Sequence, residues 1–312
     1  PPPAPPASPS PPPASPSPSP LNPGQVTGDP HFHGAHGDTF AFRGRNNTRY
    51  VMLAALRLQV NVLFVPVSFV MGSTCERCTQ KRVHGSFMKA VYFRALTETG
   101  KTVRVEYHAD APSRAQVSTS EANELIHESP ADLLVSIEKP DAIEEVIDDV
   151  TVWLKRKHTR EAAVAIRNGE FEVVATSRYL GWAKENEYRK RLDIGVRPLK
   201  DIATLKVAPH GLVGQTFDQD EYRIDGALDD YSADVVTTKA MGEGAIEGSA
   251  PDYEIPADDP FSWVFKYVRF NATSAPPRDT SALTGVRSQR EMGLKAPSAG
   301  VEGDDAALTH TA

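Results

Sequence analysis

Cysteine is scarce in this 312-residue chain, which contains only Cys75 and Cys78, separated by two residues. Because no second Cys-x-x-Cys pair exists, a four-thiolate zinc site is excluded. The residues around the pair follow the pattern of strands and loops and lack the βαβ context of a thioredoxin-like site. We interpret Cys75 and Cys78 as a local disulfide, with free thiols and a redox pair as the alternatives.

The sequence also lacks a long apolar run. Even residues 56–71, an apolar stretch, are interrupted by Arg57 and Pro66, whereas a bilayer span needs roughly 20 apolar residues. The chain is therefore predicted to be soluble and to have no membrane span. It starts at Pro1 without a Met or an apolar leader, which predicts either a removed signal peptide or a start within a longer protein.

The signatures of common enzyme classes are missing as well. The sequence has no Gly-x-Ser-x-Gly, no His-Glu-x-x-His and no Walker loop. We therefore predict a protein that is not an enzyme. The alternative is a carbohydrate-active enzyme with a Pro-rich linker, which would need an Asp/Glu pair. The chain has 41 acidic residues, and nothing in the sequence selects two of them.

Charge is unevenly distributed around a net value of −7. Residues 119–150 and 218–259 are strongly acidic, whereas the basic residues form no sequence patch with interleaved aromatics. The overall charge repels phosphate, so nucleic acid is not a predicted partner. Acidic loops of this kind either keep a surface solvated or bind cations.

Residues 1–20 consist only of Pro, Ser and Ala and cannot form a core. Because Pro fixes φ and has no amide donor, we predict a polyproline II rod in residues 1–27, whose first 20 residues span about 60 Å at roughly 3.1 Å per residue. A plain linker and an SH3 or WW ligand are alternatives. The repeated Ser-Pro units resemble the hydroxyproline-rich glycomodules of plant and green-algal wall proteins. That resemblance implies hydroxylated, glycosylated prolines, among them Pro9, Pro16, Pro18 and Pro20.

After this segment, apolar and polar residues alternate in short runs separated by turns, as in antiparallel β proteins. Gly100 is predicted at the turn of one hairpin, and Asn168-Gly169 at the turn of another. We predict a mainly β, antiparallel sandwich or barrel-like single domain over residues 28–273, with short helices at 120–127 and around Glu144. Residues 274–312 have no periodicity and are predicted to be disordered. The predicted strands are 49–53, 56–65, 87–96, 101–107, 133–137, 150–154, 162–166, 171–175, 192–196, 202–207 and 261–270.

Two blocks of the sequence resemble the opening G-D-P-H-F…F-x-F-x-G…Y-V-L and the closing G-L-C-G of von Willebrand factor type D domains. The cysteine-poor closing block is similar to plant root-cap and green-algal relatives. The resemblance covers roughly Gly28 to Phe270, with the matching residues at its two ends. They are Gly28-Asp29-Pro30-His31-Phe32, Phe40-Ala41-Phe42-Arg43-Gly44, Tyr50-Val51-Met52-Leu53 and Gly211-Leu212-Val213-Gly214.

The departures from the family pattern affect what the resemblance implies. Val213 stands at a family cysteine, so disulfide-linked multimers are not implied. The family holds calcium with an early Asp and with Asn/Asp residues after G-L-C-G, but His36 and Gln215 stand at those positions. Oxygen ligands do follow at the close spacing that calcium prefers, and we predict a calcium site there. Its ligands are Asp218, Asp220 and Asp225.

Two N-glycosylation sequons, at Asn46 and Asn271, fall at a predicted loop and a predicted strand end. Together with the rod, they are consistent with secretion. We predict a secreted structural glycoprotein of a cell wall, extracellular matrix or cell-surface fibre, of the green-algal kind. Its rod acts as a spacer, and its β module binds wall glycoproteins or polysaccharides or assembles with other copies.

Overall fold

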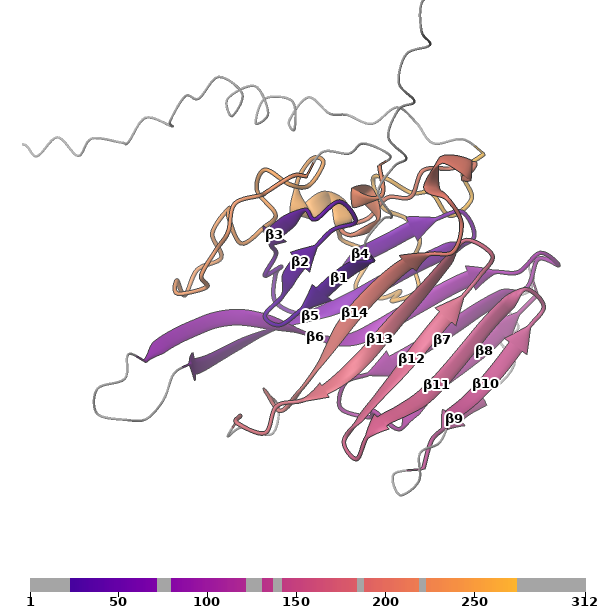
Figure 1. Ribbon diagram of the computed structural model, residues 1–312, viewed down its shortest axis with the longest axis horizontal. Helices are drawn as coiled ribbons and strands as arrows, with labels where there is room; N and C mark the ends of the chain where they lie inside the picture. The colour runs from indigo at the N-terminus through magenta and orange to yellow at the C-terminus, as the bar shows by residue number, and fades with distance from the viewer. Residues whose placement is uncertain are drawn as a thin grey trace, which may run out of the picture.

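The computed structural model describes residues 23–71, 80–121, 131–136, 142–183, 188–218 and 223–273. These residues form two antiparallel sheets, one of eight strands and one of six, which confirms the predicted mainly β class (Figure 1). The larger sheet has the order β10-β11-β12-β13-β14-β1-β2-β3, and the smaller runs from β4 to β9 in sequence order. Across the described residues, no helix combines the length and apolar character needed to cross a membrane.

The strands have the following bounds. Those of the larger sheet are β1 (Gly24–Thr27), β2 (His31–His33), β3 (Thr39–Ala41), β10 (Ala142–Ile147), β11 (Val150–His158), β12 (Glu161–Arg167), β13 (Phe171–Tyr179) and β14 (Lys190–Pro198). Those of the smaller sheet are β4 (Thr48–Ala55), β5 (Leu58–Met71), β6 (Lys81–Leu96), β7 (Thr102–His108), β8 (Arg114–Ser120) and β9 (Ala131–Leu134). Short 3-10 helices are η2 (Ile202–Thr204), η3 (Gly214–Thr216) and η4 (Ala250–Tyr253).

Side chains of both sheets share one apolar core. Along β5, Leu58, Val60 and Val62 belong to this core, as the alternation predicts. Gln59 and Asn61 between them are equally buried, and Asn61 donates to the carbonyls of Pro260 and Ser262. At the end of the core near β4, the rings of Phe42, Tyr50 and Phe64 meet edge to face, with centroids 4.9 to 5.7 Å apart. Such pairs stabilise a core by about 0.5–1.5 kcal/mol beyond the area they bury. These rings therefore fix β4 and β5 against the residues that follow β3.

Segments from the last third of the domain cover one edge of each sheet. Along β4, Leu212 N donates to Val51 O and Val213 N donates to Met52 O, each at 2.9 Å. Along β3, a parallel bridge joins Thr39 to Asp225. Open strand edges invite pairing with other chains, so these segments protect the two edges that they cover.

Residues 261–270 do not form the predicted strand. They cross the outer face of the smaller sheet, where the Arg94 guanidinium lies 5.9 Å from the Trp263 ring and 5.3 Å from the Phe270 ring. The Asn61 side chain donates to the carbonyl of Ser262 at 2.8 Å. The aromatic residues of this segment alternate as they would in a strand, but here they pack on an arginine of the sheet. The backbone of the segment is bound by a side chain of β5.

Two other predicted elements are also wrong. The predicted helix around Glu144 is strand β10, whose residues pair along their whole length with β11 through a tight turn in which Asp148 has φ +53°. The predicted strand at 202–207 begins instead as η2, because the Asp201 carboxylate accepts the Ala203 N–H at 3.0 Å and caps a helical turn. The predicted helix at 120–127 lies mostly outside the described residues, with Ser120 as the end of β8.

The predicted hairpins are present. Gly100 has φ +94° in the turn between β6 and β7, as a turn glycine requires. Asn168 works differently from a two-residue Asn-Gly turn, because its side-chain oxygen accepts the N–H groups of Glu170 and Phe171 at 2.9 and 2.8 Å. The domain also begins earlier than the predicted residue 28, since β1 starts at Gly24 and pairs with β14. The sequence did not predict β1, because the strand is only four residues long and directly follows the Pro-rich segment.

Candidate functional site

The two ends of the domain that carry the family resemblance are neighbours in the fold. Ala35 N donates to Thr216 Oγ1 at 3.1 Å, and His36 Nε2 lies 3.7 Å from Asp218 Oδ1. The buried Asp38 carboxylate accepts the N–H of Ile224. The turn at residues 34–38 therefore rests directly on the segment in which the calcium ligands are predicted.

Of the predicted calcium ligands, Asp225 is engaged by protein groups. Its Oδ1 accepts from Thr39 Oγ1 at 2.9 Å and from Arg223 Nε at 2.7 Å. Asp218 faces His36, and Asp220 lies outside the described residues. Among the residues that are described, no three His, Cys, Asp or Glu side chains gather as a metal site would require. The calcium site therefore stays a prediction, with Asp225 the ligand that would have to exchange partners.

We expect a calcium site at Asp218, Asp220 and Asp225 to show itself as ligand-linked stability. A hundredfold excess of calcium over its dissociation constant would raise the free energy of unfolding by about 2.7 kcal/mol. Thermal melts in millimolar calcium and in chelator measure this difference. Asp218→Asn should abolish it, whereas Asp258→Asn, at an exposed position, should not. Superimposable melts with and without calcium would remove the site.

The predicted modification sites divide into two groups. Asn46 and Asn271 are both exposed, each in a turn, so an oligosaccharide can be attached to either without disturbing the core. The other predicted sites lie outside the described residues and stay predictions. They are Cys75, Cys78, Pro9, Pro16, Pro18 and Pro20.

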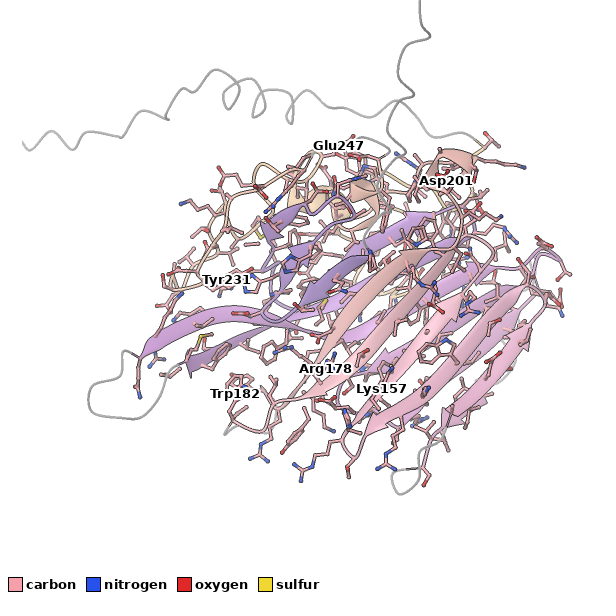
Figure 2. All side chains as sticks on the ribbon, viewed as in Figure 1. Lys157, Arg178, Trp182, Asp201, Tyr231 and Glu247 are labelled. Carbon is pink, nitrogen blue, oxygen red and sulfur yellow. The ribbon has the colours of Figure 1, made fainter. Side chains whose placement is uncertain are left out.

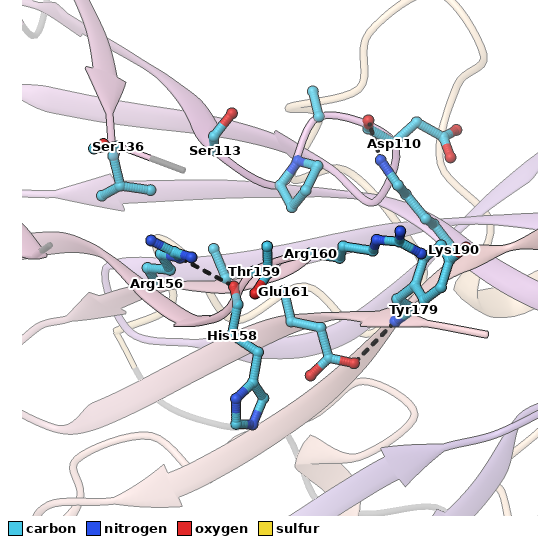
Figure 3. Close-up of a pocket in the computed structure, with 14 residues that line it drawn as sticks. Asp110, Ser113, Ser136, Arg156, His158, Thr159, Arg160, Glu161, Tyr179 and Lys190 are labelled. Atoms are coloured by element: carbon cyan, nitrogen blue, oxygen red, sulfur yellow. Dashed lines mark hydrogen bonds between the residues drawn. The ribbon is translucent and has the colours of Figure 1, made fainter. Parts of the chain in front are cut away.

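A cavity that the sequence did not predict opens at one end of the sandwich, with a volume of 510 Å³ (Figure 3). We call it the basic pocket. It lies between the β7–β8 turn, the residues after β9, the β11–β12 hairpin and the facing ends of β13 and β14. Its charged and aromatic lining residues are Asp110, Arg156, His158, Arg160, Glu161, Tyr179 and Lys190.

Three cations of the basic pocket are held by neutral groups. Arg156 Nε donates to the carbonyl of His158 at 3.2 Å, and Lys190 Nζ donates to the carbonyl of Asp110 at 2.9 Å. The Arg160 guanidinium lies over the Tyr179 ring, 4.5 Å from its centroid. Within the described part of the chain, no carboxylate pairs with Arg156, Arg160 or Lys190. Their charge is therefore available to a ligand.

The acidic side chains of the basic pocket are already neutralised. Glu161 accepts the N–H of Tyr179 at 3.0 Å and pairs with Arg178 at 3.4 Å. Burial lowers the pKa of Arg178, but the bonds and charges of Asp193 and Glu161 outweigh it and raise that pKa above its ordinary value. Asp110 pairs with Lys89 at 2.9 Å. Figure 2 shows Arg178 and Lys157 at the same end of the sandwich. Lys157 is exposed and adds a further positive charge there.

The local sequence explains why these cations gather. Lys155-Arg156-Lys157-His158-Thr159-Arg160 forms the tip of the β11–β12 hairpin, and an irregularity in the register between Arg156 and His158 breaks the alternation of the strand. This basic run is the signal by which the pocket could have been found. It was missed because the run has no interleaved aromatic residue, and Tyr179 and Lys190 join it only through the fold.

No protein-family model and no curated protein matches this chain. The function of the chain is therefore inferred from the geometry of the basic pocket. Guanidinium groups donate hydrogen bonds in pairs to carboxylate or sulfate, and a cavity of this size accepts a small group or the end of a polymer. The pocket is thus suited to bind an anion.

Proposed function

We propose that this chain is a secreted structural glycoprotein of a cell wall or extracellular matrix whose β module binds acidic polysaccharide in the basic pocket. The observation that carries the proposal is the group of cations, Arg156, Arg160 and Lys190, held by neutral partners around an open cavity. An acidic sugar offers both the anion for these cations and an apolar ring face for Tyr179. The proposal assigns the pocket to binding, not to catalysis.

The remaining features support an extracellular role. The Pro/Ser-rich segment supplies a spacer between the module and whatever precedes it, and the two exposed sequon asparagines can carry sugars. The resemblance to type D domains fits a module that binds or assembles outside the cell. On this proposal, native protein carries hydroxylated and glycosylated prolines within residues 1–20.

We expect Arg156→Gln/Arg160→Gln to weaken binding to an acidic polysaccharide such as polygalacturonate or a sulfated galactan by about tenfold or more. Each hydrogen bond to a charged group contributes about 1.5–3 kcal/mol, and a tenfold change in affinity corresponds to about 1.4 kcal/mol. Binding of the full chain is measured by calorimetry at low and at high salt. The affinity should fall with salt, because the pocket is open to solvent.

Lys200→Gln/Lys206→Gln is the matched control, because it removes the same charge from two exposed positions beyond the far end of β14. It should leave the affinity nearly unchanged. Equal losses in both double variants would mean that binding follows net charge and not the pocket. Release of shortened sugars by the unmodified protein would instead favour the carbohydrate-active enzyme.

A further inference from the structure

Beyond the core, β5 and β6 continue as a two-stranded ribbon that projects from the sandwich (Figure 1). A bulge sets the register of this ribbon, since Leu63 pairs with Ala90 but Phe64 pairs with Met88, leaving Lys89 as the extra residue. As a result, Ser68 lies directly opposite His84. In the unshifted register Ser68 would face Gly85, so the bulge creates this pair.

Ser68, His84 and Asp234 form a continuous chain of contacts. Ser68 Oγ lies 2.7 Å from His84 Nδ1, and His84 Nε2 lies 2.8 Å from Asp234 Oδ1. The His84 side chain is only 12% exposed, whereas Ser68, on the same face of the ribbon, is exposed. The hydroxyl is therefore accessible while the imidazole behind it is shielded.

The contacts fix the direction of the hydrogen bonds. A carboxylate is only an acceptor, so the contact with Asp234 is favourable when His84 Nε2 carries the proton. Nδ1 of the neutral ring then has a free lone pair, and it accepts from Ser68 Oγ. This is the arrangement in which a histidine can take the proton of a serine that attacks.

The loop that supplies Asp234 is tied to the ribbon at several points. His84 N donates to Tyr231 O at 2.6 Å, and Lys81 pairs with Asp230 at 3.1 Å. The largely buried Arg43 donates to the carbonyls of Ala233 and Asp234 at 3.2 and 3.3 Å. Tyr231 is seen beside the root of the ribbon in Figure 2. These bonds hold the backbone at Asp234 in place, and its side chain, which is 87% exposed, reaches His84 from there.

We propose that Ser68, His84 and Asp234 form an acyl-transfer site for carboxylic esters, with Ser68 as the nucleophile, His84 as the base and Asp234 as a positioning residue. The site is separate from the basic pocket and does not depend on the binding proposed there. Arg82 lies diagonally across the ribbon from Ser68, about 7–8 Å away between backbones. Arg82 is exposed, and no described carboxylate pairs with it, so it favours substrates or adducts with negative charge.

The chemistry needs only the ester and water. Ser68 Oγ bonds to the ester carbonyl carbon as its proton moves to His84 Nδ1. The bond to the alkoxy oxygen then breaks, and the alcohol leaves with the proton from His84 while Ser68 keeps the acyl group. Water repeats the two steps, which releases the carboxylic acid and restores Ser68.

The test is acylation of the full chain by p-nitrophenyl acetate and, separately, labelling by a fluorophosphonate probe, with the modified residue identified by peptide mass spectrometry. We expect one adduct, on Ser68, and none in Ser68→Ala. His84→Ala should slow acylation by about a hundredfold or more, as loss of a general base does. His108→Ala is the matched control, because His108 contacts the Glu106 carboxylate in the same sheet but no serine. It should leave the rate unchanged.

Asp234→Asn provides a second variant, at an exposed side chain whose replacement does not threaten the fold. Asp234→Asn keeps an oxygen that can accept from His84 Nε2, so it should slow acylation only slightly, whereas Asp234→Ala removes the acceptor and should slow acylation much more. A Ser68 adduct that depends on His84, whether it accumulates or turns over, supports the site. Failure of Ser68 to label, labelling at an equal rate in His84→Ala, or an unchanged acylation rate in Asp234→Ala would overturn it.

Discussion

Gly211→Ala should lower the free energy of unfolding by about 3 kcal/mol or more, one of the largest effects expected from a single methyl group in this chain. Gly211 has φ +104°, and a Cβ there would lie 2.7 Å from Met52 O and 2.9 Å from Leu53 N. The left-handed backbone costs a non-glycine residue about 1–2 kcal/mol. The clash adds to this, because its partners are backbone atoms of β4 that cannot rotate away.

The neighbouring hydrogen bonds prevent an easy relaxation. Leu212 and Val213 donate to β4 immediately after Gly211, so a shift of the backbone would break the bonds that cover this sheet edge. Gly195→Ala is the matched control, since no atom lies within 4 Å of its Cβ position and it occupies a regular strand. That change should be neutral or stabilise by about 0.5–1 kcal/mol. Urea unfolding with an unchanged slope measures both, and equal midpoints would contradict the account.

Glu247→Ala is expected to destabilise the domain by about 3 kcal/mol. Glu247 is 4% exposed, and its Oε2 lies 3.0 Å from Nε2 of His210, which is 2% exposed. Gly211 N donates to His210 Nδ1 at 2.8 Å, so the ring proton resides on Nε2 and points at the carboxylate. Removing this buried acceptor costs about 1–3 kcal/mol, and the cavity left behind adds to that.

Two substitutions separate this account from a general effect of losing charge. Glu247→Gln keeps an oxygen that can accept, so it should cost less, about 1 kcal/mol. Glu243→Ala, at an exposed position four residues earlier, should stay within about 0.5 kcal/mol of the unmodified protein. Thermal or urea unfolding gives the three values. If Glu247→Ala and Glu243→Ala cost the same, the contact with His210 does not contribute to stability.

Most of the fold could be predicted because strand patterns are local. The alternation in β5, the Gly100 turn and the β12–β13 hairpin all follow from residues close together in sequence. The failures at Glu144 and at residues 261–270 have one cause. The local sequence does not show which segment packs against each stretch. Residues 142–147 pair with β11, and residues 261–270 pack against Arg94.

The candidate sites were harder to predict, because each is assembled from distant segments. The basic pocket needs Lys190 and Tyr179 beside the tip of the β11–β12 hairpin. The Ser68–His84 pair depends on a bulge, and Asp234 follows 150 residues after His84. No short sequence motif encodes such contacts, and Ser68 does not stand in a Gly-x-Ser-x-Gly turn. The fold as a whole brings these residues together.

The covered edges of β3 and β4 constrain when the domain can fold during synthesis. Both strands leave the ribosome early, yet the segments that cover them lie near residues 210–226. Until those segments emerge, the nascent chain carries two uncovered strand edges beside apolar surface, which is the state most open to aggregation. Pairing of β1 with β14 imposes the same delay on the larger sheet. Folding of this domain can therefore be completed only after residues 210–226 have emerged, and a chaperone that shields the first strands until then would meet that need.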